Sequence, residues 1–456
     1  MCNCVISTVS RHLSAYLPAR PTAAGHLQRP IALPFYITMQ IFTAVFLVAL
    51  LLTFCTRMWL ATRHIHHVLA HRDSVPGDFS SQINLEAHQK AADYTCAKTR
   101  LGYASISLET ALLLLFTLGG GLSVLASFWS NLLNNPLANG MALIISAMLL
   151  MGVAEIPVSY YRTFIIEQQF GFNKMTPRMF LADLVKRTAL GMLFGVPLLL
   201  GVLWLMEKMG ANWWFYAWLA WMGFNLVVLA IYPTWIAPLF NKFTPLEDAA
   251  LRARIEKLMR KCGFKSSGLF VMDGSRRSNH GNAYFTGFGK TKRIVFFDTL
   301  LSRLDAAEIE AVLAHELGHF KRRHVIKRIA WSFAMSLVFL SMLGYLMQQG
   351  WFYQGLGVSI SCLPSTALAL LLFFLVMPAF TFLFQPLASL YSRKHEFEAD
   401  EYAAHNASAT DLMRALVKLY QDNAATLTPD PLHSAFYDSH PPAAMRIARL
   451  QNLAHN

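Results

Sequence analysis

The sequence is poor in charged residues and rich in apolar ones. Of its 456 residues, 14% are Asp, Glu, Lys or Arg, and 55% are hydrophobic. Ordinary soluble domains carry about 25% charged residues. The composition therefore argues against a soluble enzyme and predicts a protein that crosses a membrane several times.

The sequence also lacks paired cysteines and nucleic-acid-binding runs. Its six cysteines are scattered without C-x-x-C spacing, so they indicate no disulfide framework. The formal net charge is +13, yet no basic run is interleaved with aromatic residues as in RNA-binding segments. We assign this charge to loops beside anionic lipid and expect no nucleic-acid partner.

Residues 1–36 lack an apolar run long enough for the core of a signal peptide. They hold Arg11, Arg20 and Arg29 among Pro, Ser and Ala, whereas a clean apolar segment opens at Met39. One hypothesis is that translation starts at Met39. The alternative is a disordered tail.

Seven apolar segments have roughly the length that spans about 30 Å of hydrocarbon, namely 37–58, 108–128, 138–160, 188–207, 213–238, 329–349 and 364–391. Basic residues gather in alternate loops, and the intervening loops hold a single one, Lys208. The positive-inside rule then places the N-terminus outside and residues 241–328 and the C-terminal tail in the cytoplasm. Near the membrane ends, Glu155 and Asp183 are expected to pair with a cation such as Arg162 or Arg187.

The organisation expected from these segments has five parts: a tail at 1–36, five membrane helices with their loops at 37–240, a cytoplasmic catalytic α/β insertion at 241–328, two membrane helices at 329–391, and a cytoplasmic tail at 392–456 that completes the metal site. Within the insertion, the pattern predicts an amphipathic helix at 245–262. It predicts strands at 268–272, 282–285 and 293–297, the last two around Gly287-Phe-Gly289. The fold class is thus predominantly α, with a small α/β domain.

The stretch 311–320 contains His315, Glu316 and His319 in the order H-E-x-x-H. Four residues advance a helix by about 400°, which places the two histidines on one face, one turn apart. This spacing lets both imidazoles bind one tetrahedral Zn²⁺, with Glu316 placed to accept a proton from a bound water. The alternative is a solvated amphipathic helix that carries two histidines by chance.

A catalytic zinc needs a third protein ligand and an open position for water. The helical stretch 392–400 continues the last apolar segment and offers His395, Glu396, Glu398 and Asp400. Glu396 and Asp400 share a face at i and i+4, whereas Glu398 points away from it. Spacing alone does not choose between Glu396 and Asp400.

The chain resembles the integral-membrane zinc metalloproteases of the CAAX prenyl endopeptidase type, which process a-factor and prelamin A. The matching pieces run from about Phe170 to Arg446 and are Phe170-Gly-Phe-Asn173, Pro238-Leu-Phe-Asn-Lys-Phe-Thr-Pro245, Asn282-Ala-Tyr-Phe285, His315-Glu-Leu-Gly-His319, Ser392-Arg393 with Glu396 and Ala399-Asp400, and His440-Pro441 with Arg446. Seven membrane spans also agree with this family. Residues 1–36 have no recognised counterpart.

The resemblance implies a role for each matching residue. Glu396 would be the third zinc ligand, beside His315 and His319, and Asp400 would support a ligand histidine by a hydrogen bond. Asn282 and His440 would line the cleft, and Arg446 would brace the His440 loop. The seven helices would enclose a chamber that the zinc domain, zincin-like in fold, caps on the cytoplasmic side.

These observations predict a membrane-embedded zinc metalloendopeptidase with one Zn²⁺ per chain, acting on a membrane-associated or CAAX-type peptide or protein. Its catalytic residues would be Glu316, His440 and Asn282. A protease that cuts within the membrane is disfavoured, because charged residues flank the motif on both sides. Two further alternatives are a quality-control protease without prenyl specificity and a non-enzymatic zinc-containing scaffold, against which the intact Glu316 argues.

Overall fold

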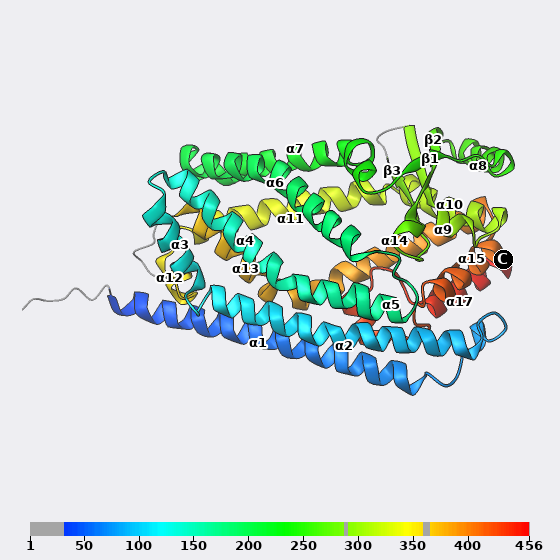
Figure 1. Ribbon diagram of the computed structural model, residues 1–456, viewed down its shortest axis with the longest axis horizontal. Coiled ribbons are helices and arrows are strands. Elements are labelled where there is room, and N and C mark those ends of the chain that lie inside the picture. Colours follow the sequence, from blue (N-terminus) through cyan, green and yellow to red (C-terminus); the bar gives the residue numbers. More distant parts are fainter. Residues whose placement is uncertain (1–31, 287–290, 359–364, 456) are drawn as a thin grey trace, which may run out of the picture.

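The computed structural model describes residues 32–286, 291–358 and 365–455. Most of the tail predicted at 1–36 therefore lies outside the described residues, and so does the whole of Gly287-Phe-Gly289. Figure 1 shows long helices running along the long axis, with the small sheet and the last helices gathered at one end. The long helices are α1 (Ala32–Ala70), α2 (Leu85–Phe116), α4 (Pro136–Tyr161), α6 (Pro177–Lys208), α7 (Trp213–Ile231), α11 (His324–Leu346), α13 (Thr366–Thr381) and α14 (Gln385–Asn406).

Shorter helices connect these elements and build the end of the molecule that carries the sheet. They are α3 (Gly121–Leu132), α5 (Glu167–Gln169), α8 (Ala249–Cys262), α9 (Asp298–Leu301), α10 (Ala306–Lys321), α12 (Gly350–Gly355), α15 (Ala409–Asp422), α16 (Pro431–Tyr437) and α17 (Ala443–His455). Short 3₁₀ or π turns are η1 (Gly77–Phe79), η2 (Arg162–Ile166), η3 (Gly210–Asn212), η4 (Tyr232–Ile236), η5 (Ala237–Leu239), η6 (Gly274–Arg276) and η8 (Phe382–Phe384).

The helical segments confirm a multi-pass membrane protein. Within the described residues, six are long and apolar enough to span a membrane: Thr38–Ala70, Pro136–Gln169, Pro177–Lys208, Gly210–Leu239, His324–Leu346 and Thr366–Asn406. The pair α2 and α3 makes a seventh if it is counted as one bent span. The expected segments thus correspond to six spans and one broken pair.

The break between α2 and α3 interrupts the segment expected at 108–128. The two helices meet at 52°. Gly120 precedes α3 as its N-terminal cap, with φ +77°, a backbone conformation that residues other than glycine rarely adopt. A Cβ on Gly119 would lie 2.8 Å from the carbonyl oxygen of Leu115. The apolar segment expected at 108–128 is therefore divided between two helices, because the run of glycines turns the chain.

The sheet has four strands, β1 (Phe243–Pro245), β2 (Lys265–Met272), β3 (Ala283–Thr286) and β4 (Thr291–Phe297), in the order β1-β2-β4-β3. Strands β2 and β4 are parallel, and the other pairs are antiparallel. The three predicted strands are present. The pattern missed β1, which has only three residues, and placed the start of α8 too early. That helix begins after Asp248, whose carboxylate accepts a hydrogen bond from the Leu251 amide.

The two largest apolar cores among the described residues lie in different parts of the molecule. One joins α8, the sheet, α10, α15 and α17, with Ile255, Phe296 and Leu317 fully buried. The other lies in the helical bundle around α13, where Leu368 and Leu372 are fully buried. Helix α14 continues from α13 into the first core, so it links the bundle to the sheet domain (Figure 1).

Helices α10 and α14 pack closely at Gly318. A Cβ at Gly318 would lie 3.0 Å from the Cα of Ala399 and 3.1 Å from the Cβ of Tyr402. Because one of these contacts is with backbone, the neighbour cannot simply rotate away. Glycine is required for this crossing, which brings the His315–His319 face against Glu396 and Asp400.

We expect Gly318→Ala to force α10 and α14 apart and to destabilise the protein by about 1–3 kcal/mol, the usual effect of overpacking. Thermal unfolding of the detergent-solubilised protein, together with its metal content, measures this. The control is Gly102→Ala in α2, where nothing lies within 4 Å of the added Cβ. Equal unfolding temperatures and metal contents for the two variants would contradict the close crossing.

Candidate metal centre

Helix α10 is fixed at its N-terminus by a capping box. The Asp305 carboxylate accepts hydrogen bonds from the amides of Ala307 and Glu308, and the Glu308 carboxylate accepts one from the Asp305 amide. Glu308 is buried, and Lys418 on α15 approaches it to 2.7 Å. These contacts set the rotation of the helix and therefore the direction in which its histidines point.

His315 and His319 on α10 meet Glu396 on α14. The two Nε2 atoms lie 3.3 Å apart. Glu396 places Oε2 3.5 Å from His315 Nε2, and Oε1 3.4 Å from His319 Nε2. Among the described residues, this is the one cluster of at least three His, Cys, Asp or Glu ligand atoms that all lie within 4.8 Å of one another.

The donor set fits a tetrahedral zinc ion. Ligand atoms about 2.0–2.1 Å from such an ion lie roughly 3.3–3.4 Å from each other, and the separations here match. The buried Oε2 of Glu396 makes no hydrogen bond of normal geometry, although His440 Nδ1 lies 2.6 Å from it. A cation between these atoms would satisfy the carboxylate and the facing imidazole nitrogens together. Spacing left Glu396 and Asp400 as alternatives for the third ligand. Of the two, Glu396 faces the Nε2 atoms of both histidines, which are the nitrogens that would bind a metal ion.

Asp400 lies behind the group rather than in it. Its Oδ1 accepts a hydrogen bond from His315 Nδ1 at 2.8 Å, and its two oxygens contact Arg446 Nη2 at 2.5 Å and Nε at 2.8 Å. All three side chains are buried, and Asp400 is wholly so. The Asp400 hydrogen bond keeps a proton on Nδ1, so Nε2 is the nitrogen of His315 that faces Glu396 and is available to a metal ion.

The electrostatics of His315 follow from this arrangement. Burial alone would lower the pKa of His315, but hydrogen bonds to Asp400 and Glu396 outweigh burial and raise it to about 9. Arg446 is also buried, and the Asp400 carboxylate outweighs that burial and raises the pKa of the guanidinium. Arg446 therefore stays charged, and a proton competes with a metal ion for His315.

The second histidine has a relay that the sequence analysis missed. His319 Nδ1 lies 3.0 Å from His324 Nδ1, and His324 Nε2 lies 2.9 Å from Glu398 Oε2. Arg323, at φ +58°, turns the chain between α10 and α11 and brings His324 back toward His319. Glu398 does point away from the Glu396 face, as expected, and there it orients His319 through His324. The available signal in the sequence was His324, which stands five residues after His319.

Glu316 lines a cavity of about 280 Å³ next to the ligand group. Its carboxylate makes no hydrogen bond or ion pair with any residue that the structure describes. His315, Asn282, His440 and Arg446 line the same cavity. The structure thus brings the site residues expected from the sequence to one place. Most are ligand candidates or line this cavity, and Asp400 lies behind them in contact with His315 and Arg446.

Asn282 is held at the start of β3. Its side-chain oxygen accepts a hydrogen bond from the Ala283 amide, and its carbonyl accepts one from the Phe297 amide. Three residues earlier, the backbone amide of Asn279 donates a hydrogen bond to the Phe172 carbonyl, and its side-chain amide donates one to the Gly171 carbonyl. The motif at 170–173 therefore anchors the segment that carries Asn282 into the cavity.

A metal-ligand group with a neighbouring unpaired carboxylate, attached to a bundle of membrane-spanning helices, defines a membrane-embedded metalloendopeptidase. Two family models cover most of the chain. The first, described as "CAAX prenyl protease N-terminal, five membrane helices", matches residues 64–242, and the second, peptidase family M48, matches residues 245–454. The chain belongs to peptidase family M48.

Individual relatives agree with this assignment. The chain is 38% identical to a CAAX prenyl protease 1 homolog of Arabidopsis thaliana over 318 residues, which is 69% of this chain and 73% of that protein. It is 36% identical to CAAX prenyl protease 1 of Saccharomyces cerevisiae over 313 residues, covering 65% and 69% of the two chains. The crystal structure of S. mikatae Ste24p superposes with a TM-score of 0.82 at 30% identity, covering 91% of this chain and 99% of that one.

We expect Arg446→Met to weaken metal binding about 10–100-fold, as loss of a residue that orients a ligand commonly does. Removing the guanidinium leaves Asp400 buried without its cationic partner and loosens the bond that orients His315. Chelator competition on the purified protein measures the metal affinity. The control is Arg449→Met on the same helix, where the arginine is half exposed and reaches Glu401 at 3.7 Å. Equal affinities would contradict the role of Arg446.

Proposed function

We propose that this metalloendopeptidase holds one zinc ion on His315, His319 and Glu396 and cleaves membrane-associated proteins of the CAAX type. The observation that carries the chemistry is the unpaired Glu316 carboxylate, which lines the same cavity as His315. The substrate class is supported by the relatives, which are named CAAX prenyl protease 1 or its homolog.

Each residue has a defined task in this proposal. A zinc ion bound here would supply a water with a pKa near 7 and would polarise the scissile carbonyl. Glu316 takes the proton of the attacking water and later passes it to the leaving amine. Asp400 and Glu398 hold the two histidines in the tautomers that leave Nε2 free, Glu398 acting through His324.

His440 and Asn282 are proposed to donate hydrogen bonds to the oxyanion that develops on the substrate. Both line the Glu316 cavity, and the His440 side chain is 63% exposed, so a substrate can reach it. Pro441 and Pro442 follow His440 and restrict its backbone. Arg446, four residues beyond Pro442, fixes the following helix by its bonds to Asp400.

The proposed topology places the N-terminus outside and the zinc domain and C-terminus in the cytoplasm. The alternation of basic loops along the chain supports this orientation. We also propose, from the family resemblance, that the helices enclose an internal chamber. In five of the six spans only 6–17% of the most apolar window is buried, whereas the span that contains α13 is 50% buried. Most side chains of the five spans are therefore open to lipid or to such an interior.

We expect Glu316→Gln to abolish cleavage while zinc stays bound, because the amide cannot accept the proton of the water but leaves the three ligands intact. Purified, detergent-solubilised wild type and variant are compared on a quenched-fluorescence peptide ending in a CAAX sequence, in farnesylated and unmodified forms. Elemental analysis gives the zinc content of both proteins. Wild type is expected to contain about one zinc per chain and to prefer the farnesylated peptide.

The outcomes separate the alternatives. Equal cleavage of both peptides, lost in Glu316→Gln, would reject prenyl specificity and favour a quality-control protease. Zinc without Glu316-dependent cleavage of either peptide would reject the peptidase and favour a scaffold. Loss of zinc from the variant would mean that Glu316 also holds the metal.

We expect His440→Ala to lower kcat by about 10²–10³, the usual effect of removing one oxyanion donor, with little change in KM. Steady-state kinetics on the preferred peptide measure the split between kcat and KM. The control is His405→Gln on α14, whose ring contacts only the Glu401 carbonyl of its own helix. Because His440 also lies close to Glu396, a parallel loss of zinc would assign it to ligand support instead.

A further inference from the structure

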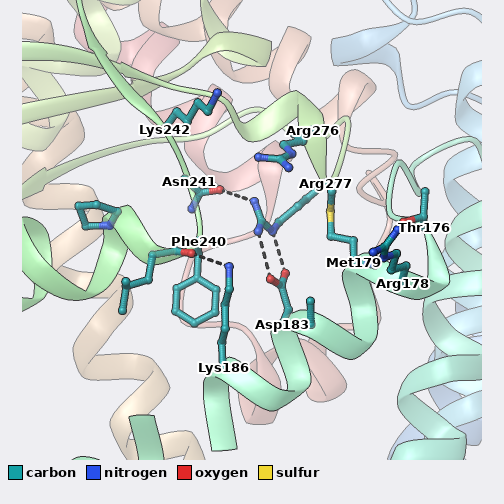
Figure 2. A pocket seen from close by; sticks show the side chains of 13 residues that line it. Thr176, Arg178, Met179, Asp183, Lys186, Phe240, Asn241, Lys242, Arg276 and Arg277 are labelled. Carbon is teal, nitrogen blue, oxygen red and sulfur yellow. Dashed lines mark hydrogen bonds and ion pairs between the residues drawn. The ribbon is translucent and has the colours of Figure 1, made fainter. Parts of the chain in front are cut away.

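A second cavity lies away from the metal centre, where the membrane bundle meets the sheet domain. Its volume is about 420 Å³, and it shares no lining residue with the cavity of Glu316. Three segments form it: the first turns of α6, the chain after α7 from Pro238 to Lys242, and the end of η6 (Figure 2). It therefore lies at the ends of two membrane spans.

The cavity is strongly basic. Five cationic side chains line it and only one carboxylate, that of Asp183; the cations are Arg178, Lys186, Lys242, Arg276 and Arg277. Asp183 is buried and pairs with Arg277, with contacts of 2.9 and 3.2 Å. The sequence analysis expected a cationic partner for Asp183, and the structure shows that this cation is Arg277. One positive charge is thus neutralised, and four are not.

The remaining cations have no anionic partner among the described residues. Lys186 donates a hydrogen bond to the Leu239 carbonyl at 2.8 Å, which is a neutral acceptor. Arg178, Lys242 and Arg276 are exposed, and their side chains make no hydrogen bond or ion pair with any residue that the structure describes. Concentrated positive charge around a hollow of this size favours a ligand that carries several negative charges.

A partly buried group of hydrogen bonds around Arg277 fixes the shape of the cavity. Arg277 is bonded to Asp183 on α6, and its Nη1 also contacts the side-chain oxygen of Asn241 at 2.9 Å (Figure 2). One guanidinium therefore joins α6, the chain after α7 and η6. The surrounding cations are held on a rigid frame, which distinguishes this cavity from the diffuse positive charge expected of any loop beside a membrane.

The apolar surface next to the cavity places it at a bilayer surface. On α6, Leu181 and Val185 are each 59% exposed, and after α7 Trp235 is 74% and Leu239 49% exposed. Exposed aliphatic side chains beside an exposed tryptophan, at the end of membrane spans, are typical of the boundary between acyl chains and headgroups. A lipid whose chains pack along these residues would bring its headgroup to the cations.

We propose that this cavity binds the headgroup of a polyanionic phospholipid, of the phosphorylated-inositol class, from the leaflet that faces the zinc domain. Arginine pairs with phosphate through two parallel hydrogen bonds, and lysine adds point charge. A singly charged headgroup would leave most of the four free cations uncompensated. The proposal concerns membrane attachment and is independent of the proposed substrate and catalytic roles.

The test compares lipid binding by the full-length protein in phosphatidylcholine nanodiscs that contain phosphatidylinositol 4,5-bisphosphate, measured by native mass spectrometry. The variant is Lys242→Gln with Arg276→Gln. The matched control is Lys174→Gln with Arg187→Gln. It also removes one lysine and one arginine charge, but from exposed positions near the same boundary and outside the cavity lining. We expect the cavity variant to lose affinity roughly tenfold or more and the control to stay near wild type.

Further arms define the source of the phosphate. Phosphatidylserine at equal total charge is expected to bind more weakly, and soluble inositol 1,4,5-trisphosphate is expected to compete only weakly because it lacks acyl chains. Equal loss in both double variants, or equal binding of phosphatidylserine, would overturn the proposal in favour of general surface potential. Full competition by the soluble phosphate would overturn the lipid source. A changed KM for a soluble peptide in the cavity variant would assign the cavity to substrate instead.

Discussion

The close crossing of α10 and α14 is the constraint on which the rest of the structure depends. Gly318 lets the two helices approach to backbone contact, and this places Glu396 opposite His315 and His319. Both helices lead directly into membrane spans: α10 turns at Arg323 into α11, and α14 continues from α13. The candidate metal ligands are therefore held by the bundle as well as by the sheet domain, so the site keeps its geometry only while those two spans keep theirs.

Buried charge makes this arrangement specific. Asp400 lies without solvent exposure between His315 and Arg446, and a carboxylate in that position is costly unless both partners are present. The second histidine, His319, is oriented by the less buried relay through His324 to Glu398, whose side chain is 26% exposed. The two ligands thus differ in how firmly they are oriented. The firmer relay ties α10 and α14 to α17, and so brings the C-terminal tail into the metal site.

Local patterns predicted the features that depend on local spacing. The placement of the two histidines on one helix face follows from the 3.6-residue period and the three strands from their local pattern, whereas the membrane spans follow from the length of apolar runs. Glu396 and Asp400 share one helix face, so only the rotation of α14 against α10 separates them, and that is a tertiary quantity. For the same reason Glu398 was set aside, since its partner His324 lies on another helix. The sequence indicated that Asp183 needs a cationic partner but not which one, because Arg277 reaches it from 94 residues away.

The basic cavity and the metal centre are separate, but one short segment connects them. Arg277 anchors its start through Asp183 and Asn241, and Asn282 ends it in the cavity of Glu316. The Arg277 carbonyl accepts a hydrogen bond from the Lys174 amide, and the Asn279 amide donates one to the Phe172 carbonyl. The segment has little freedom to move independently of the chain beside α5. Because only four residues lie between Arg277 and Asn282, the same contacts that shape the basic cavity also fix where β3 begins beside the candidate metal centre.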